Sequence, residues 1–348
     1  MAGRSVGEYR RLTTKVRVLL LRLTGLLISV ALVWRLVDWQ ALAAIALRLA
    51  PSLLAFVVVC ALFRAWLSSL RWKLMDPDPG DQLRHWDYFR YVMVGAVFNL
   101  FLPGALGGDL VRSILVVREL DSHRGSGVAA IAADRMLGLF SILVLGSVAC
   151  IIAPGLEGRF YYLAVLIPLD VAFIFGCWVA VAPKLNHALM DWVDRPGRAW
   201  SAAHRIVRTW SEIATFYRKN PGHVGWAILL CIPIHFSWFL IVYLIARAIG
   251  IEVSFLGLAM VTSLAWLITA LPISFGGLGV RELSFIYLLS IQGVDPESSA
   301  LLGICQFGVI VATSLIGVPM IWMGKRIRAV PVMPVNPNAG DESGEVLK

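Results

Sequence analysis

The feature that most constrains the fold is a series of apolar runs, each about as long as a bilayer is thick. A membrane-spanning helix needs about 20 predominantly apolar residues, and the runs that meet this requirement are 18–37, 51–72, 126–153, 159–182, 222–248 and 298–323. Of the 348 residues, 15% are charged, whereas a soluble domain carries about 25%. The sequence therefore predicts an all-α polytopic membrane protein with six full spans.

Two further apolar segments, 86–120 and 255–294, are each interrupted by the same pattern of residues. The first contains LPGALGGDLVR, from Leu102 to Arg112, and the second contains LPISFGGLGVR, from Leu271 to Arg281. The two align without gaps as L-P-x-x-x-G-G-x-x-x-R. Because proline ends a helix and paired glycines allow a tight turn, each segment is predicted to be a helical hairpin.

The distribution of Lys and Arg predicts how the spans are oriented. Basic residues gather in the N-terminus (1–17), in 71–90, in 118–124, in 184–220 and in 324–328, and the positive-inside rule places these connections in the cytoplasm. This assignment is consistent only if hairpin 86–120 is re-entrant from the cytoplasm and hairpin 255–294 from outside. The prediction is six full spans plus two oppositely oriented re-entrant hairpins that form an inverted repeat.

The remaining segments complete the expected domain organisation. Residues 1–17 form a basic cytoplasmic N-terminus, 18–328 the transmembrane domain and 329–348 a disordered cytoplasmic tail rich in Pro, Gly and acidic residues. The basic, Trp-containing segment 184–220 suits a cytoplasmic interfacial helix, with a solvated linker as the alternative. The first apolar run is interpreted as a retained span, because it is too long for a signal peptide.

The paired motifs also predict a binding site. Irregular chain at membrane depth is tolerated where it lines an aqueous cavity, and transporters with inverted repeats bind substrate near the midplane at such broken helices. The helix that follows each glycine pair offers free N–H groups to an anion, and an arginine one turn later adds forked recognition of phosphate. The motif residues assigned to substrate binding are Asn99, Pro103, Gly107, Gly108, Asp109, Arg112, Pro272, Gly276, Gly277, Gly279, Arg281 and Glu282. Two kinked helices, with glycine for packing and arginine reaching to an interface, are the alternative.

Other ionisable residues inside apolar segments are candidates because charge within a membrane is costly and is usually functional. Asp134 and Arg135 either join the binding site, where Asp134 could pair with a hairpin arginine, or form a local ion pair. Asp170, Asp134 and Glu282 are candidates for proton or ion coupling, and a buried hydrogen bond is an equal alternative for Asp170. His235 is expected to be a satisfied core histidine.

These motifs resemble the transmembrane, flippase-like domain of the lysylphosphatidylglycerol synthase family. The resemblance rests on NLFLPGALGGDLVR, AAIAADRMLGL and LPISFGGLGVRE, and it covers about residues 15–328. It implies a lipid translocator and carries the site over to the motif residues above except Asp109, and to Asp134 and Arg135. The chain shows no synthase domain after its last span, so an aminoacylated lipid is not implied as the substrate.

The function expected from the sequence is a flippase that moves a lipid with a phosphate-bearing or other anionic headgroup across a bacterial inner membrane. No phosphate-binding loop, metal-ligand spacing or nucleophile motif occurs, so no cofactor, metal or catalytic residue is predicted. The partners expected are membrane lipids, with a second copy of the chain or a lipid-synthesising enzyme as protein partners, and no nucleic acid. A membrane-embedded enzyme, or a glycosyltransferase-partner subunit acting on a lipid phosphate, is the alternative.

Overall fold

The computed structural model describes residues 40, 50–76, 83–101, 107–119, 124–153, 157–182, 191, 214–270 and 277–323, and the described part is helical without strands. Five of its helices are long and apolar enough to cross a membrane. They are α3 (Pro51–Met75), α6 (Arg124–Ile152), α7 (Arg159–Val181), α10 (Pro221–Ala248) and α13 (Pro296–Gly317), followed by the short 3-10 helix η1 (Pro319–Ile321). They coincide with five of the six predicted spans, and the sixth, 18–37, lies outside the described residues.

Both interrupted segments consist of two packed helices, as the Pro/Gly motifs predict. The first pair is α4 (His85–Phe101) and α5 (Gly107–Glu119), and the second is α11 (Phe255–Ala270) and α12 (Val280–Ser290). Helices α4 and α5 run antiparallel, because Asn99 lies against Gly108 while Gly95 lies against Arg112. The re-entrant placement and the inverted repeat depend on where the bilayer lies, so they stay predictions.

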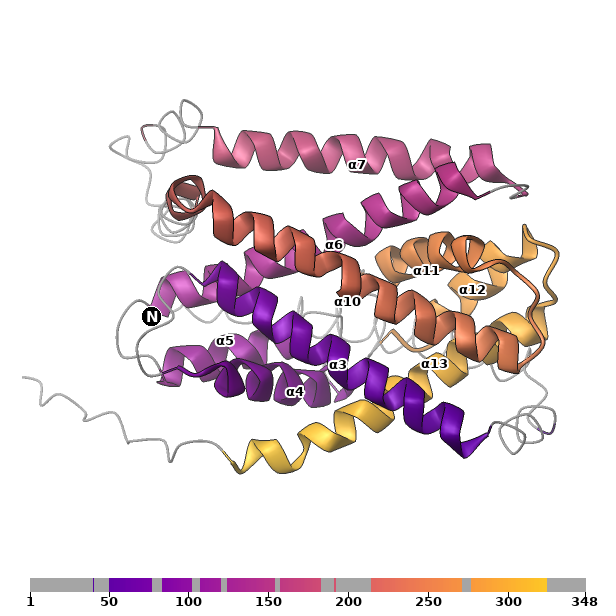
Figure 1. Ribbon diagram of the computed structural model, residues 1–348, viewed down its shortest axis with the longest axis horizontal. Coiled ribbons are helices and arrows are strands. Elements are labelled where there is room, and N and C mark those ends of the chain that lie inside the picture. Colours follow the sequence, from indigo (N-terminus) through magenta and orange to yellow (C-terminus); the bar gives the residue numbers. More distant parts are fainter. Residues whose placement is uncertain are drawn as a thin grey trace, which may run out of the picture.

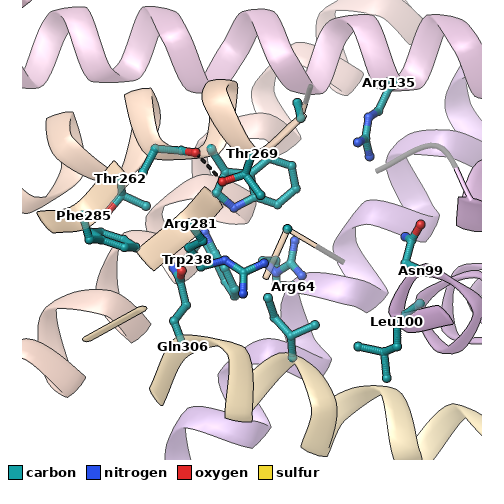
Figure 2. Close-up of a pocket in the computed structure, with 16 residues that line it drawn as sticks. Arg64, Asn99, Leu100, Arg135, Trp238, Thr262, Thr269, Arg281, Phe285 and Gln306 are labelled. Atoms are coloured by element: carbon teal, nitrogen blue, oxygen red, sulfur yellow. Dashed lines mark hydrogen bonds between the residues drawn. The ribbon is translucent and has the colours of Figure 1, made fainter. Parts of the chain in front are cut away.

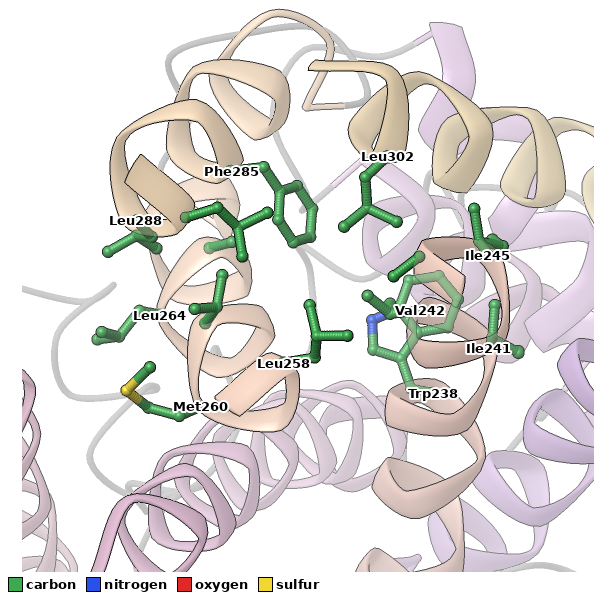
Figure 3. Packing of buried hydrophobic residues seen from close by; sticks show 14 of the residues in the cluster. Trp238, Ile241, Val242, Ile245, Leu258, Met260, Leu264, Phe285, Leu288 and Leu302 are labelled. Atoms are coloured by element: carbon green, nitrogen blue, oxygen red, sulfur yellow. The ribbon is translucent and has the colours of Figure 1, made fainter. Parts of the chain in front are cut away.

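The long helices enclose the second hairpin and hold the first against one side (Figure 1). Helix α3 packs along α10, α11 packs on α6, and α13 contacts both α4 and α12. The largest cluster of buried apolar side chains joins α10 to the second hairpin: Trp238 and Val242 face Leu258, Phe285 and Leu302 (Figure 3). The second hairpin is therefore part of the core, and its position is fixed by packing on several helices.

Helix α7 lies at the edge of the molecule beside α6 (Figure 1). Its surface is apolar and open: Phe160 is 86% exposed and Trp178 is 66% exposed. A contiguous exposed apolar surface of this kind marks contact with a membrane or a protein. Together with the five long apolar helices, it identifies a polytopic membrane protein.

Three predicted segments fall on residues outside the described part. They are the N-terminus (1–17), most of the basic segment 184–220 and the tail (329–348). The cytoplasmic N-terminus, the interfacial helix and the disordered tail therefore stay predictions.

Candidate functional site: an arginine-lined cavity between the two hairpins

A cavity of about 160 Å³ lies between the two hairpins. Ala96, Asn99 and Leu100, near the end of α4, form one side of it, and α11 and α12 form the other (Figure 2). The motif residues Gly277 and Arg281 belong to this second side. The cavity therefore lies between the end of α4 and the start of α12, among described residues that flank the two interruptions.

Three arginines line this cavity, and each comes from a different helix. They are Arg64 of α3, Arg135 of α6 and Arg281 of α12. Among the described residues, the lining includes no aspartate and no glutamate. Because a cation in a medium of low dielectric constant is costly unless an opposite charge lies close to it, the cavity is suited to an anion.

Four polar groups of the lining have no hydrogen-bond partner within the described part of the chain. They are Arg64 Nε, Trp238 Nε1, Thr262 Oγ1 and Gln306 Nε2. Trp238, Thr262 and Gln306 are only 3%, 0% and 1% exposed. Buried polar groups are nearly always paired with protein or water, so several unpaired donors around one cavity indicate a place for an acceptor.

Arg64 occupies a central position between the hairpins. Its guanidinium lies over the Trp238 ring, 4.7 Å from the ring centroid, and Figure 2 shows it beside Arg281 and Trp238, with Arg135 and Asn99 farther along the cavity. Stacking on the indole stabilises the cation and fixes its direction. No carboxylate within the described residues forms an ion pair with Arg64.

A second cavity of about 100 Å³ adjoins the first. The two share Arg64, Arg135, Trp238 and Trp266 as a common wall. The second cavity adds three charged side chains, those of Arg71, Arg112 and Asp134. Its other additional lining residues are Ser68, Gly138, Leu139, Ile142, Ile234 and His235. The hairpin arginines thus lie on different sides of this wall, Arg281 in the first cavity and Arg112 in the second.

An ion-pair network connects the first hairpin to α3 and α6. Asp134 Oδ1 lies 2.9 Å from Arg71 Nε, and Asp134 Oδ2 lies 3.7 Å from Arg112 Nη2. Asp109 Oδ1 accepts from Arg112 Nη1 at 3.0 Å, and its other oxygen lies 3.7 Å from Arg135 Nη1. Arg112 also stacks on Trp72, 4.1 Å from the ring centroid. Arg112 is therefore held by two carboxylates and one aromatic ring.

Close approach of α4 and α5 is made possible by glycine. A Cβ atom on Gly108 would lie 2.6 Å from Asn99 Nδ2, and one on Gly95 would lie 3.0 Å from the Gly108 carbonyl oxygen. The Gly108 N–H donates to Asn99 Oδ1 at 2.6 Å. Asn99 thus holds the start of α5 to the end of α4, and its oxygen is occupied within the protein.

The turn before α12 requires glycine for its backbone conformation. Gly277 has φ +78° and Gly279 has φ +79°, values that other residues rarely adopt. The Gly279 N–H donates to Glu282 Oε2 at 2.5 Å, and Glu282 is fully buried. Glu282 therefore caps the helix that carries Arg281.

The start of each outgoing helix is predicted to offer free N–H groups to an anion. One N–H of each motif has a partner within the protein, since Gly108 N–H donates to Asn99 and Gly279 N–H donates to Glu282. Asp109 and Glu282 also lie in the first turns of these helices, where a carboxylate satisfies the helix dipole. Positive charge at the site comes from arginine side chains instead.

The structure separates the other candidates. Asp134 lies 2.9 Å from Arg71 and 3.7 Å from the hairpin arginine Arg112, so its shortest ion pair joins it to α3, and its part in a binding site stays a prediction. Asp170 accepts from Ser147 Oγ at 2.5 Å and lines neither cavity, so the buried hydrogen bond is the role with direct geometric support. His235 Nε2 lies 2.8 Å from Ser141 Oγ. Pro103, Pro272 and Gly276 lie outside the described residues, and Gly107 is buried at the start of α5.

Sequence reasoning misplaced one arginine and missed several lining residues. Arg71 was counted with the loop charges of 71–90, but it lies inside α3, is 5% exposed and pairs with Asp134. Trp238, Thr262 and Gln306 were not predicted as site residues, and neither was Arg64. Within the described residues, no group of three His, Cys, Asp or Glu side chains is arranged to hold a metal ion.

Comparison with known proteins agrees with the membrane architecture. The family model described as the lysylphosphatidylglycerol synthase TM region matches residues 22–317. A protein named UPF0104 membrane protein, from Methanothermobacter thermautotrophicus (strain Delta H), is 28% identical over 273 residues, which cover 72% of this chain and 78% of that protein. No solved structure matches the chain. The chain belongs to the family of the lysylphosphatidylglycerol synthase transmembrane region.

Proposed function

We propose that the protein is a lipid translocator, a flippase that moves a lipid with an anionic, phosphate-bearing headgroup between the leaflets of a bacterial inner membrane, with both termini in the cytoplasm. The observation that carries the proposal is the cavity between the hairpins, in which Arg64, Arg135 and Arg281 meet without a carboxylate among the described lining residues. An anionic headgroup would bind among these three cations, one of which, Arg135, also lies 3.7 Å from Asp109.

The lining suits a headgroup attached to apolar tails. Leu100, Ala265, Ala270, Phe285 and Ile310 supply apolar surface beside the arginines. Binding sites that are mostly apolar with a few convergent polar groups fix the orientation of a ligand through the polar groups. The tails of the lipid would stay in the bilayer while the headgroup enters.

The adjoining cavities suggest a path for the headgroup. It would leave Arg281, pass the shared wall of Arg64 and Arg135, and arrive at Arg112. Arg112 and Arg135 already share Asp109, so an arriving phosphate would compete with a carboxylate there. This competition would keep binding weak enough for release.

The proposal is tested in proteoliposomes that contain a fluorescent anionic phospholipid and report its movement by quenching from outside. Arg281→Ala and Arg64→Ala are expected to abolish movement, while each protein still purifies as a folded, monodisperse species. Arg247→Ala is the matched control, because Arg247 is exposed near the end of α10. Wild-type rates in the Arg64→Ala, Arg281→Ala double variant would contradict the proposal.

An enzyme acting on a lipid phosphate is the second candidate. It is favoured by Asp134 and His235, which line the second cavity together with Arg71 and Arg112 and belong to residue types used in acid–base catalysis. Mass spectrometry of the fluorescent lipid after the assay separates the two. A lipid that changes leaflet at constant mass supports translocation, and a mass change supports the enzyme.

A further inference from the structure

We infer that the headgroup accepted by the cavity is a phosphate dianion, either a phosphomonoester or a diphosphate, that presents acceptor oxygens and no cationic group. This inference rests on the proposed function and names its substrate class. It assigns recognition of the headgroup to Trp238, Thr262 and Gln306 as well as to the arginines. Of all these residues, only Arg281 is part of the repeated motif.

The hydrogen-bonding groups that await a partner are donors. Arg64 Nε, Trp238 Nε1 and Gln306 Nε2 can only donate, and Thr262 Oγ1 can donate or accept. All four line the same cavity, and they come from α3, α10, α13 and α11. A ligand with several acceptor oxygens, such as a phosphate, is the chemical match for a cavity lined by these residues.

The balance of charge points to two negative charges on the ligand. Around the two cavities the described residues supply five arginines and three carboxylates, and these are Arg64, Arg71, Arg112, Arg135, Arg281, Asp109, Asp134 and Glu282. The carboxylates Asp109 and Asp134 already bridge Arg71, Arg112 and Arg135. Over the two cavities together, two positive charges are left, and a dianion neutralises them more fully than the single charge of a phosphodiester.

A headgroup with an ammonium group finds no complementary site in this lining. The described part of the first cavity has no carboxylate, so only an aromatic face could attract a cation. The faces of Trp238 and Trp266 are taken by guanidinium groups, with Arg64 at 4.7 Å and Arg135 at 5.9 Å from the ring centroids. Zwitterionic and aminoacylated headgroups are therefore disfavoured by charge repulsion.

Selectivity in the wild-type protein tests the inference without any variant. Proteoliposomes would carry fluorescent phosphatidic acid (a monoester), phosphatidylglycerol (a diester) or phosphatidylcholine (a zwitterion). Phosphatidic acid is expected to move at least about tenfold faster than phosphatidylglycerol, which is the discrimination that one charge-assisted hydrogen bond supplies. Phosphatidylglycerol moving as fast as phosphatidic acid would overturn the dianion inference and leave the flippase intact.

A free phosphate offers the same chemistry as a lipid phosphate, so uptake of radiolabelled inorganic phosphate is measured in the same vesicles. Lipid movement without phosphate uptake supports a lipid-borne dianion. Phosphate uptake without lipid movement would contradict the flippase while supporting the dianion site. If the vesicles show no lipid movement and no phosphate uptake, both the flippase and the dianion site are overturned.

Gln306→Glu gives the residue-level test, because it keeps the shape of the side chain and replaces a donor by a negative charge. It is expected to reduce movement of phosphatidic acid at least about tenfold more than movement of phosphatidylglycerol. Gln292→Glu is the matched control, since Gln292 lies in the turn after α12 and lines neither of these two cavities. An unchanged ratio in Gln306→Glu would refute the role of Gln306.

Discussion

The two hairpins carry the same eleven-residue frame, but the structure uses their arginines differently. In the first hairpin, Arg112 is held by Asp109 and Asp134 and stacks on Trp72. In the second, the neighbouring acid Glu282 turns back to cap its own helix, and Arg281 lines the cavity between the hairpins. Similar local sequence therefore accompanies a pair of packed helices in both places, while the surrounding helices decide what each arginine does.

The difference separates a network that holds the structure together from a surface prepared for a ligand. The first hairpin is joined to α3 and α6 by charges that compensate one another. The second is held by apolar packing with α10 and α13, and this packing leaves polar donors around the cavity. Substitutions in the first hairpin should mainly lower stability, whereas those in the second should mainly lower transport.

The largest effect is expected for Asp134→Asn, which removes the carboxylate shared by Arg71 and Arg112. Breaking a buried ion pair by removing one partner costs about 3–5 kcal/mol, because a buried charge is left uncompensated. The free energy of unfolding, measured by denaturant titration in detergent micelles, should fall by this amount. Asp295→Asn is the control, because it removes a charge from an exposed helix start. A stability equal to the control would show that the network is not structural.

Arg281→Ala should lower transport strongly and stability only modestly. Loss of one charge-assisted contact to the headgroup is expected to reduce the rate by about 100-fold, the equivalent of about 2.7 kcal/mol. Arg281 lies beside Glu282 and over the Phe307 ring, so the melting temperature is expected to fall, but by less than in Asp134→Asn, where two arginines lose a shared carboxylate. Rates come from the leaflet-quenching assay, and melting temperatures from the same preparations. A clear loss of stability with normal transport would reverse the roles assigned to the two hairpins.

Gly108→Ala tests the close approach inside the first hairpin. The added methyl group would collide with Asn99 and with the Gly95 carbonyl, and overpacking of this kind costs about 1–3 kcal/mol. Gly308→Ala in α13 is the matched control, since nothing lies within 4 Å of a Cβ there and alanine favours a helix. Thermal unfolding should separate the two variants, and equal melting temperatures would argue against tight packing at Gly108.

The smallest effect is expected at the start of α13. Asp295 accepts from the Ser298 N–H at 2.7 Å, and this bond lowers the pKa of the carboxyl group. Asp295→Ala should cost about 1 kcal/mol, while Asp295→Asn keeps the cap. Because the pKa is lower in the folded state, the ionised cap stabilises the protein above about pH 4 and loses this effect as the pH falls further. A wild-type protein with the same acid response as Asp295→Asn would rule this contribution out.

The sequence predicted the helices and their breaks because both are local. The length of an apolar run sets a span, Gly277 supplies the positive φ of the turn before α12, and Gly108 lets α5 approach α4 closely. The lining of the cavity was less accessible, because Trp238, Thr262 and Gln306 come from three separate helices whose packing brings them together. Arg71 was assigned to a loop because charges near a span end usually are, and only its distance to Asp134 shows otherwise.

The central claim is that the cavity between the hairpins holds an anionic lipid headgroup. Quantitative mass spectrometry of lipids retained by the purified protein tests it directly, with wild type compared with the double variant Arg64→Gln, Arg281→Gln and with the control Arg247→Gln. We expect wild type and control to retain an equimolar amount of a phosphate-bearing anionic lipid, and the double variant to lose it. The same lipid in the same amount in all three proteins would contradict the claim.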